Sequence, residues 1–175
     1  MLIHEEKVKT NRVAFVAKVK EICQRLDIDP NWLMQVMYFE TAHTMSHTIE
    51  NPHTKATGLI QFMPSTAISL GTTVTALKAM TNVQQLDWVH KYFTPHKGKM
   101  KSFVDVYFTV FFPIAVGKPD DWVLQTSTLS ASRIASQNTG FDLNKDGKLT
   151  VAEIREVILR KVPKDWQEYF AGKKK

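Results

Sequence analysis

The spacing of apolar residues along this chain predicts a structure built mostly from helices. Apolar residues follow a helical period in residues 11–25, where Val13 and Cys23 belong to the apolar face, and again after Thr81 as far as Phe93. Shorter helices are predicted for residues 64–71, 75–80, 150–160 and 164–170. No internal repeat and no linker interrupts the series. The sequence therefore predicts one mostly α domain over residues 1–175.

The segment 30–42 is apolar at almost every position, which is typical of a buried helix. Asp29 is predicted as its N-cap and Pro30 as its first residue. Glu40 is the one charged residue in the segment and lies near the helix C-terminus. Apolar surroundings and the negative end of the helix dipole both disfavour the carboxylate, so the pKa of Glu40 is expected to be raised. A carboxyl group that stays protonated near neutral pH is what a glycosidase needs as its general acid.

Three other segments are assigned by their composition and context. Residues 102–112 are rich in Val, Phe and Tyr, a composition that favours a strand. Their length and helical neighbours favour a buried helix instead, ended by Pro113. Asp120 and Asp121 are predicted to cap a helix that runs to Gln125, and residues 43–57 are predicted to form a loop.

Charge and composition narrow the class of protein. The chain carries a net charge of +6 with one cysteine, so it has no internal disulfide, and it has no apolar run long enough to cross a bilayer. The charge suggests an anionic partner, either nucleic acid or the bacterial wall. The lysines gather near residues 97–101 and at 173–175 without interleaved aromatics, and no nucleic-acid motif is present. A wall partner is therefore favoured, and a basic nucleic-acid binder is the weakest alternative.

Residues 142–153 match the EF-hand loop rule at every position. The rule asks for side-chain oxygens early in the loop, a glycine at the sixth position for the sharp turn and a bidentate glutamate at the twelfth. The predicted calcium ligands are Asp142, Asn144, Asp146, the carbonyl of Lys148 and Glu153, with Thr150 acting through a water. The entering segment, residues 127–138, is Ser-rich and a poor helix. The sequence thus predicts a structural calcium clamp and not a sensor.

Two blocks carry a resemblance to a known superfamily. Glu40-Thr41, followed by Ala-Thr-Gly-Leu-Ile-Gln-Phe-Met-Pro-Ser-Thr-Ala at residues 56–67, resembles the soluble lytic transglycosylases and goose-type lysozymes. Thr41 stands where the family usually has Ser. The family's Ala-Tyr-Asn-Ala-Gly block is not present as such, and Tyr107 is the nearest candidate for its tyrosine. Some lytic transglycosylases carry a structural EF-hand-like calcium site, in agreement with the loop at residues 142–153.

The resemblance implies a lysozyme-like domain that cleaves the β-1,4 bond between N-acetylmuramic acid and N-acetylglucosamine in peptidoglycan. Glu40 would be the general acid and base. The expected substrate-binding residues are Gly58, Leu59, Ile60, Gln61, Phe62 and Tyr107. Gly58 would let the backbone approach the sugar, and main-chain groups nearby would bond its N-acetyl groups.

Several alternatives stay open. The family can work with one carboxyl group, so the product is an anhydro end if the sugar's C6 hydroxyl attacks and a reducing end if water attacks. Glu50 is the nominee for a second carboxylate. A catalytically idle calcium-binding module that interacts with the wall is the competing class. Zinc at His43, His47 and His53 is disfavoured because no His-Glu-x-x-His motif is present.

A monomer is expected. The N-terminus shows no secretory signal, so a phage lysis or tail-associated enzyme and a domain of a larger secreted protein both fit.

Overall fold

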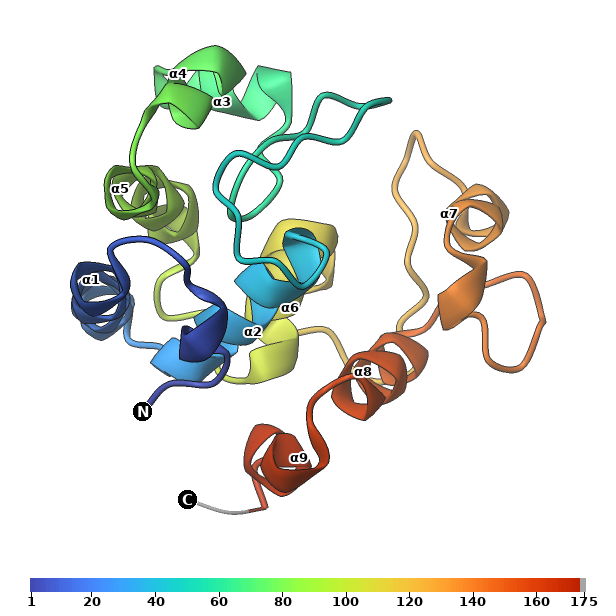
Figure 1. Cartoon of the computed structure of the whole chain (residues 1–175). Helices are drawn as coiled ribbons and strands as arrows, with labels where there is room; N and C mark the ends of the chain where they lie inside the picture. Colours follow the sequence, from blue (N-terminus) through green and yellow to red (C-terminus); the bar gives the residue numbers. More distant parts are fainter. Residues whose placement is uncertain (174–175) are drawn as a thin grey trace. The chain divides into compact units, whose positions relative to one another are not determined.

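The computed structural model describes residues 1–173, which fold mostly into helices (Figure 1). The α-helices are α1 (Arg12–Leu26), α2 (Pro30–Glu40), α3 (Pro64–Leu70), α4 (Val74–Ala79), α5 (Asn82–Phe93), α6 (Phe103–Phe111), α7 (Ala131–Gln137), α8 (Val151–Arg160) and α9 (Lys164–Phe170). Within the described residues the β-structure is limited to isolated bridges. The mostly α class is therefore confirmed. Of the predicted basic tail, Lys174 and Lys175 lie outside the described residues.

Two compact units make up the chain, Met1–Gly98 and Lys99–Lys175. Each is described by itself below, and the single domain over residues 1–175 stays a prediction. None of the helices in residues 1–173 is both long and apolar enough to cross a membrane.

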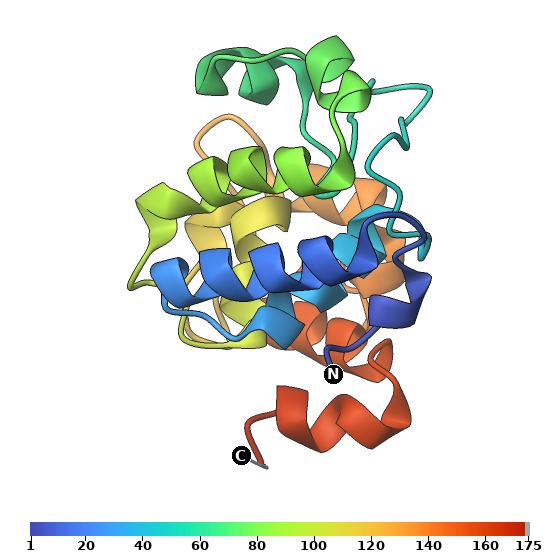
Figure 2. The same ribbon diagram turned by 60° about the vertical axis from the view of Figure 1, so that its left-hand side comes forward.

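Helices α1, α2 and α5 form the core of the first unit. Helix α1 packs against both α2 and α5, and Figure 2 shows α1 and α5 side by side. Cys23 is fully buried in α1, and burial raises the pKa of its thiol, as expected for a small apolar core residue. Val13 is 86% exposed, so its assignment to the apolar face was wrong. The neighbouring Phe15 is fully buried and anchors that end of the helix.

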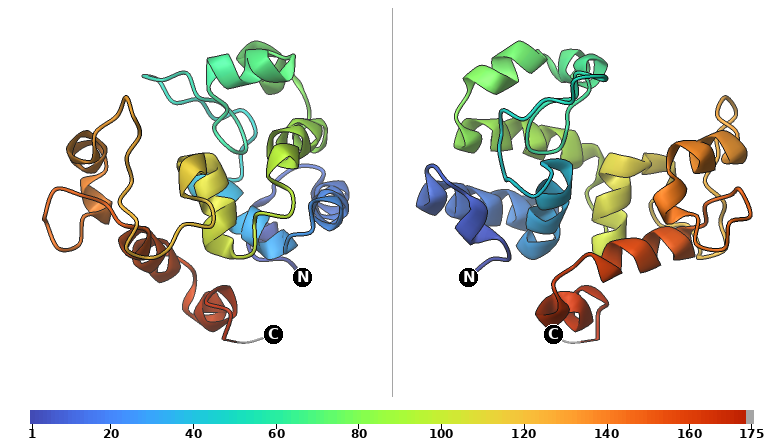
Figure 3. Two further views of the ribbon diagram at one scale, coloured as in Figure 1. Left: turned by 180° about the vertical axis from the view of Figure 1, so that it is seen from behind. Right: turned by 45° about the vertical axis from the view of Figure 1, so that its right-hand side comes forward.

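A long loop follows α2 and leads through a tight turn into α3 and α4 (Figure 3). Antiparallel bridges join Thr57 to both Glu50 and Phe62, so the loop folds back twice on itself. As predicted, Pro64 opens α3, and Gly71 ends it in the left-handed conformation with φ of 91°. The turn at residues 58–61 is thereby fixed between a bridge and a helix start.

The second unit contains α6 to α9. The prediction of a helix over the Val- and Phe-rich segment is confirmed, because α6 ends at Phe111 before Pro113. Phe103 of α6 packs edge-on against Phe170 of α9, with ring centroids 4.8 Å apart.

The helix predicted to run to Gln125 is absent. Val123 instead forms an antiparallel bridge with Thr150, and the Leu124 N–H donates to the Leu149 carbonyl at 2.8 Å. Pairing with a distant segment outweighs the local capping signal there.

Candidate functional site

Glu40 is the last residue of α2, as the sequence predicts. Asp29 caps the start of the helix by accepting the Asn31 N–H at 2.7 Å, and Pro30 occupies the first turn. The buried face of α2 carries Leu33, Met34, Gln35, Val36 and Met37. Burial raises the pKa of Glu40 to about 7, which agrees with the desolvation expected from the apolar segment. At neutral pH a large fraction of the Glu40 carboxyl group is therefore protonated.

The turn that follows Glu40 is a Schellman motif made without glycine. The His43 N–H donates to the Tyr38 carbonyl at 2.8 Å, and the Ala42 N–H donates to the Phe39 carbonyl at 3.2 Å. Ala42 and His43 have φ of 48° and 68°, a left-handed conformation that costs about 1 kcal/mol or more per non-glycine residue. The His43 ring stacks on Tyr38 with centroids 4.7 Å apart. The chain direction at the end of α2 is thus set by specific contacts that hold a strained turn.

Thr41 fastens this turn to the helix. Its hydroxyl donates to the Met37 carbonyl at 2.7 Å and accepts the Met45 N–H at 2.9 Å, and the residue is completely buried. A serine hydroxyl at this position would make the same two bonds. Serine and threonine are therefore equivalent for the two hydrogen bonds that hold this turn.

Thr41→Val is expected to destabilise the protein by about 2 kcal/mol, because the shape is kept while the Met45 N–H loses its buried acceptor. Thr41→Ser loses one methyl group and should cost about 1 kcal/mol. Urea denaturation of the three proteins measures the difference. Equal stability of the Val variant and the wild type would show that the hydroxyl does not hold the turn.

Tyr92 is a site residue that the sequence did not reveal. It lies on α5, half-buried, and its ring meets Phe62 edge-on with centroids 6.2 Å apart. Burial raises the pKa of the Tyr92 phenol, and the negative charge of Glu40 raises it further. Tyr92 therefore lies within electrostatic reach of Glu40 and links the acid to the turn that ends at Phe62. This proximity is non-local, and no spacing in the sequence reports it.

The predicted substrate segment 58–62 forms a tight turn in the same unit. Leu59, Ile60 and Phe62 are buried, with exposures of 0%, 2% and 2%. The N–H groups of Gly58 and Gln61 donate to the carbonyls of Ile49 and Gly58 at 2.8 and 3.1 Å. Since these donors already have partners inside the protein, the turn acts mainly as a scaffold.

The residue this scaffold presents is Gln61, which is half-buried with φ of 52°. Its side-chain amide nitrogen donates to the Gly58 carbonyl at 3.2 Å. That bond turns the amide oxygen of Gln61 away from the Gly58 carbonyl. Of the predicted segment, Gln61 is the residue best placed to meet a ligand.

Glu50, the nominee for a second carboxylate, is held in ion pairs. Its two oxygens lie 2.6 Å from Lys78 Nζ and 3.4 Å from Lys55 Nζ. The hydrogen bond from Lys78, followed by that from Lys55, lowers the pKa of Glu50. Glu40 and Glu50 are thus shifted in opposite directions, and Glu50 has the contacts of a residue that fastens the loop to α4.

Tyr107, the remaining predicted substrate residue, belongs to the second unit. It is 6% exposed on α6 and stacks on Phe111 with centroids 5.4 Å apart. Its role in the substrate site stays a prediction.

The loop at residues 142–153 wraps around its first carboxylate. Asp142 accepts the Asp146 N–H at 3.2 Å and the Gly147 N–H at 3.1 Å, while Asn144 Oδ1 also accepts from Asp146. The Lys148 N–H donates to Asp146 at 2.9 Å. Gly147 has φ of 77°, as the sharp turn requires. The predicted ligands offer oxygen atoms, the donors that a hard cation such as calcium prefers.

Glu153, the predicted twelfth ligand, forms a capping box at the start of α8. Its carboxylate accepts the Thr150 N–H at 2.9 Å and the Leu143 N–H at 3.1 Å. Within residues 1–173, no three His, Cys, Asp or Glu side chains form a preassembled metal cluster. The residues fit a calcium loop by chemistry and backbone, and Glu153 would exchange hydrogen bonds for metal coordination.

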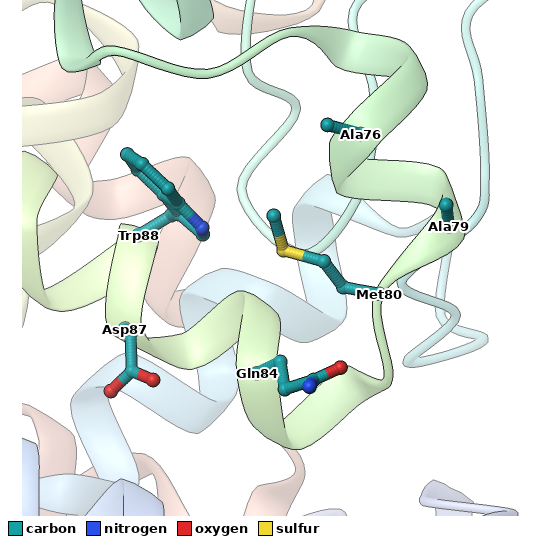
Figure 4. Close-up of a pocket in the computed structure, with 6 residues that line it drawn as sticks. All are labelled: Ala76, Ala79, Met80, Gln84, Asp87 and Trp88. Carbon is teal, nitrogen blue, oxygen red and sulfur yellow. The ribbon is translucent and has the colours of Figure 1, made fainter.

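A surface groove of about 450 Å³ lies between α4 and α5. Trp88 and Met80 face it, with Gln84 and Asp87 at its edge (Figure 4). None of the residues lining this groove belongs to the predicted site. The candidate site is therefore defined by Glu40, Tyr92 and the turn at residues 58–62.

No family model matches this chain, and neither does any curated protein or solved structure.

Proposed function

We propose that this protein is a peptidoglycan-cleaving glycosidase with a lysozyme-like fold, either a lytic transglycosylase or a muramidase. The observation that supports it most directly is the carboxyl group of Glu40, whose pKa is raised to about 7 by burial at the end of an apolar helix. A raised pKa at a helix terminus beside a strained turn is typical of a general acid. The net charge of +6 suits an anionic wall polymer.

The chemistry needs one carboxyl group. Protonated Glu40 gives its proton to the bridging glycosidic oxygen as the bond to the muramic acid C1 breaks. The substrate's N-acetyl group assists at C1, and the Glu40 carboxylate then takes a proton from the incoming nucleophile. The sugar's C6 hydroxyl gives an anhydro-muramic end, and water gives a reducing end. The ion pairs of Glu50 with Lys78 and Lys55 favour this single-carboxyl scheme.

Mass spectrometry of muropeptides after digestion of purified peptidoglycan tests the proposal. Anhydro and reducing ends differ by one water, so the masses separate transglycosylase from hydrolase. Intact glycan strands after prolonged incubation at several pH values would contradict both activities. In that case the competing class, a catalytically idle calcium-binding wall module, is preferred.

The pH dependence of cleavage follows from the pKa of about 7 at Glu40. Because the acid form is required, kcat/KM on soluble glycan strands is expected to be level below pH 7 and to fall about tenfold per unit above it. Initial rates between pH 3.5 and 9 measure the profile. A fall centred near pH 4.5 would show that Glu40 titrates as an ordinary exposed glutamate.

We also propose that residues 142–153 bind calcium as a structural ion. The support is the set of oxygen donors together with the backbone wrap around Asp142. When bound, calcium would join the two ends of the loop and so strengthen the start of α8.

A further inference from the structure

We propose that Gln85 is a positioning residue that holds the turn at residues 58–61 for the glycan substrate, an inference that rests on the proposed glycosidase function. Gln85 lies on α5 and is completely buried. No part of its side chain reaches the surface, so its role is to fix other groups.

The side chain of Gln85 joins three segments of the first unit. Its oxygen accepts the Leu59 N–H at 2.7 Å. Its nitrogen donates to the His47 carbonyl and to the Leu77 carbonyl, both at 2.9 Å. One amide therefore ties the tight turn, the long loop after α2 and helix α4 to the same point on α5. Both N–H groups and the oxygen have partners, which a buried amide needs if it is to specify one arrangement.

Gly58 allows this approach. A Cβ at residue 58 would lie 2.4 Å from Gln85 Oε1 and 2.8 Å from Cδ. Gly58 also has φ of 82°, which L side chains rarely adopt. The glycine of the motif is thus required by Gln85 behind the turn and by the backbone. A close approach of sugar to the backbone is not needed to explain it.

Through the turn, Gln85 also sets the position of a residue nearer the surface, Gln61. The Gly58 carbonyl, next to the Leu59 N–H held by Gln85, accepts hydrogen bonds from the backbone and side chain of Gln61. Phe62, the residue after the turn, packs edge-on against Tyr92. Since the charge of Glu40 acts on the Tyr92 phenol, this end of the turn lies toward Glu40. Gln85 is expected to set where Gln61 meets the substrate while leaving Glu40, on α2, in place.

Gln85→Met keeps the length of the side chain and removes all three hydrogen bonds. We expect KM for soluble glycan strands to rise at least tenfold while kcat stays within about threefold, measured at a temperature where circular dichroism shows the variant folded. Gln24→Met, at an exposed position on α1, is the matched control and should change neither constant. An unchanged KM in folded Gln85→Met, or a fall in kcat alone, would overturn the inference.

Gln85→Glu provides a second variant with a pH signature. The new carboxyl group, when neutral, accepts from Leu59 and donates one bond, whereas its ionised form faces the carbonyls of His47 and Leu77 without a donor. Burial raises the pKa of such a carboxyl group. The ratio of the variant's KM to the wild-type KM should therefore rise about tenfold between pH 5 and 8, and the ratio for Gln85→Met should stay level. A Gln85→Glu variant whose KM equals the wild-type KM at every pH would also refute the positioning role.

Hydrogen exchange separates this inference from the proposed function. The Leu59 amide should exchange at least tenfold faster in Gln85→Met, while α2 amides keep their protection. If the wild type cleaves no peptidoglycan, the proposed function and the positioning role for a glycan both fail. Fast Leu59 exchange would then still establish Gln85 as the clamp of the turn, and unchanged exchange would refute the clamp itself.

Discussion

Glu40→Gln should reduce peptidoglycan cleavage by roughly 10³-fold or more, because glutamine cannot give a proton to the glycosidic oxygen and cannot later accept one. The replacement keeps the shape and the hydrogen-bonding size of the side chain, and it removes a charge that the apolar end of α2 disfavours. Release of soluble muropeptides from purified sacculi measures the loss. Glu21→Gln, on the exposed side of α1, is the matched control and should cleave at the wild-type rate.

The same variant should be more stable than the wild type at neutral pH. The folded-state pKa of Glu40 is about 7 and the ordinary value is 4.5. Between these values the unfolded chain loses the proton while the folded protein keeps it, so the wild type loses stability as the pH rises. Below pH 4.5 both states are protonated and Glu40→Gln should gain little.

Above pH 7 the gain of Glu40→Gln should reach its plateau, about 3 kcal/mol. Urea denaturation at pH 4, 6 and 8 follows the difference. A gain that is equal at all three pH values would mean that the Glu40 pKa is not raised by folding.

Cleavage by a well-folded Glu40→Gln protein at the wild-type rate would remove Glu40 from the chemistry altogether.

The raised pKa of Glu40 could be predicted from the sequence because its signal is local. The apolar residues around Glu40 predict a buried helix face, and burial predicts that the pKa of its carboxyl group is raised. The structure shows both features. The ends of several helices could be predicted from the sequence for the same reason. Asp29, Thr81 and Gly71 act as caps within one turn of their own helices.

Gln85 and Asn82 were missed although a signal existed. Both fall on the stripe of α5 that carries Leu86, Val89 and Phe93, and both are buried. A polar residue within an apolar stripe indicates a buried amide with specific partners. The partners themselves, such as the Thr10 carbonyl that accepts from Asn82 Nδ2 at 2.8 Å, come from distant segments and are not encoded in the spacing.

At the segment around Val123 the error was the opposite one, because a local signal was followed and the predicted helix is absent. Its aspartates carry a local capping signal, but the chain there pairs with residues 149–151. The Asp120 carbonyl accepts the Ala152 N–H at 3.0 Å, and its carboxylate pairs with Arg155 at 2.5 Å. Tertiary pairing with the start of α8 therefore determines this segment. It also connects the segment to the predicted calcium loop.

Glu153→Gln should lower the calcium affinity of the protein by about 100-fold or more, because the twelfth ligand of such a loop supplies two charged oxygens. Glutamine can still accept the Thr150 N–H in the capping box, so without calcium the variant should lie within about 1 kcal/mol of the wild type. Glu156→Gln, an exposed residue of the same helix, is the matched control and should keep the wild-type affinity. Isothermal titration calorimetry on protein first treated with a chelator measures the calcium affinity of the wild type and of both variants.

Thermal denaturation should show calcium binding as an increase in the stability of the folded protein. If calcium is present at about 100 times its dissociation constant, binding to the folded state alone adds about 2.7 kcal/mol. Wild type and Glu156→Gln should therefore melt at a higher temperature with calcium than with a chelator, and Glu153→Gln should melt at nearly the same temperature in both. Because the loop residues pair with Trp122–Leu124, protection of the Leu124 amide should rise with calcium as well. A wild type indifferent to calcium in both measurements would show that Glu153 serves α8 only as a cap.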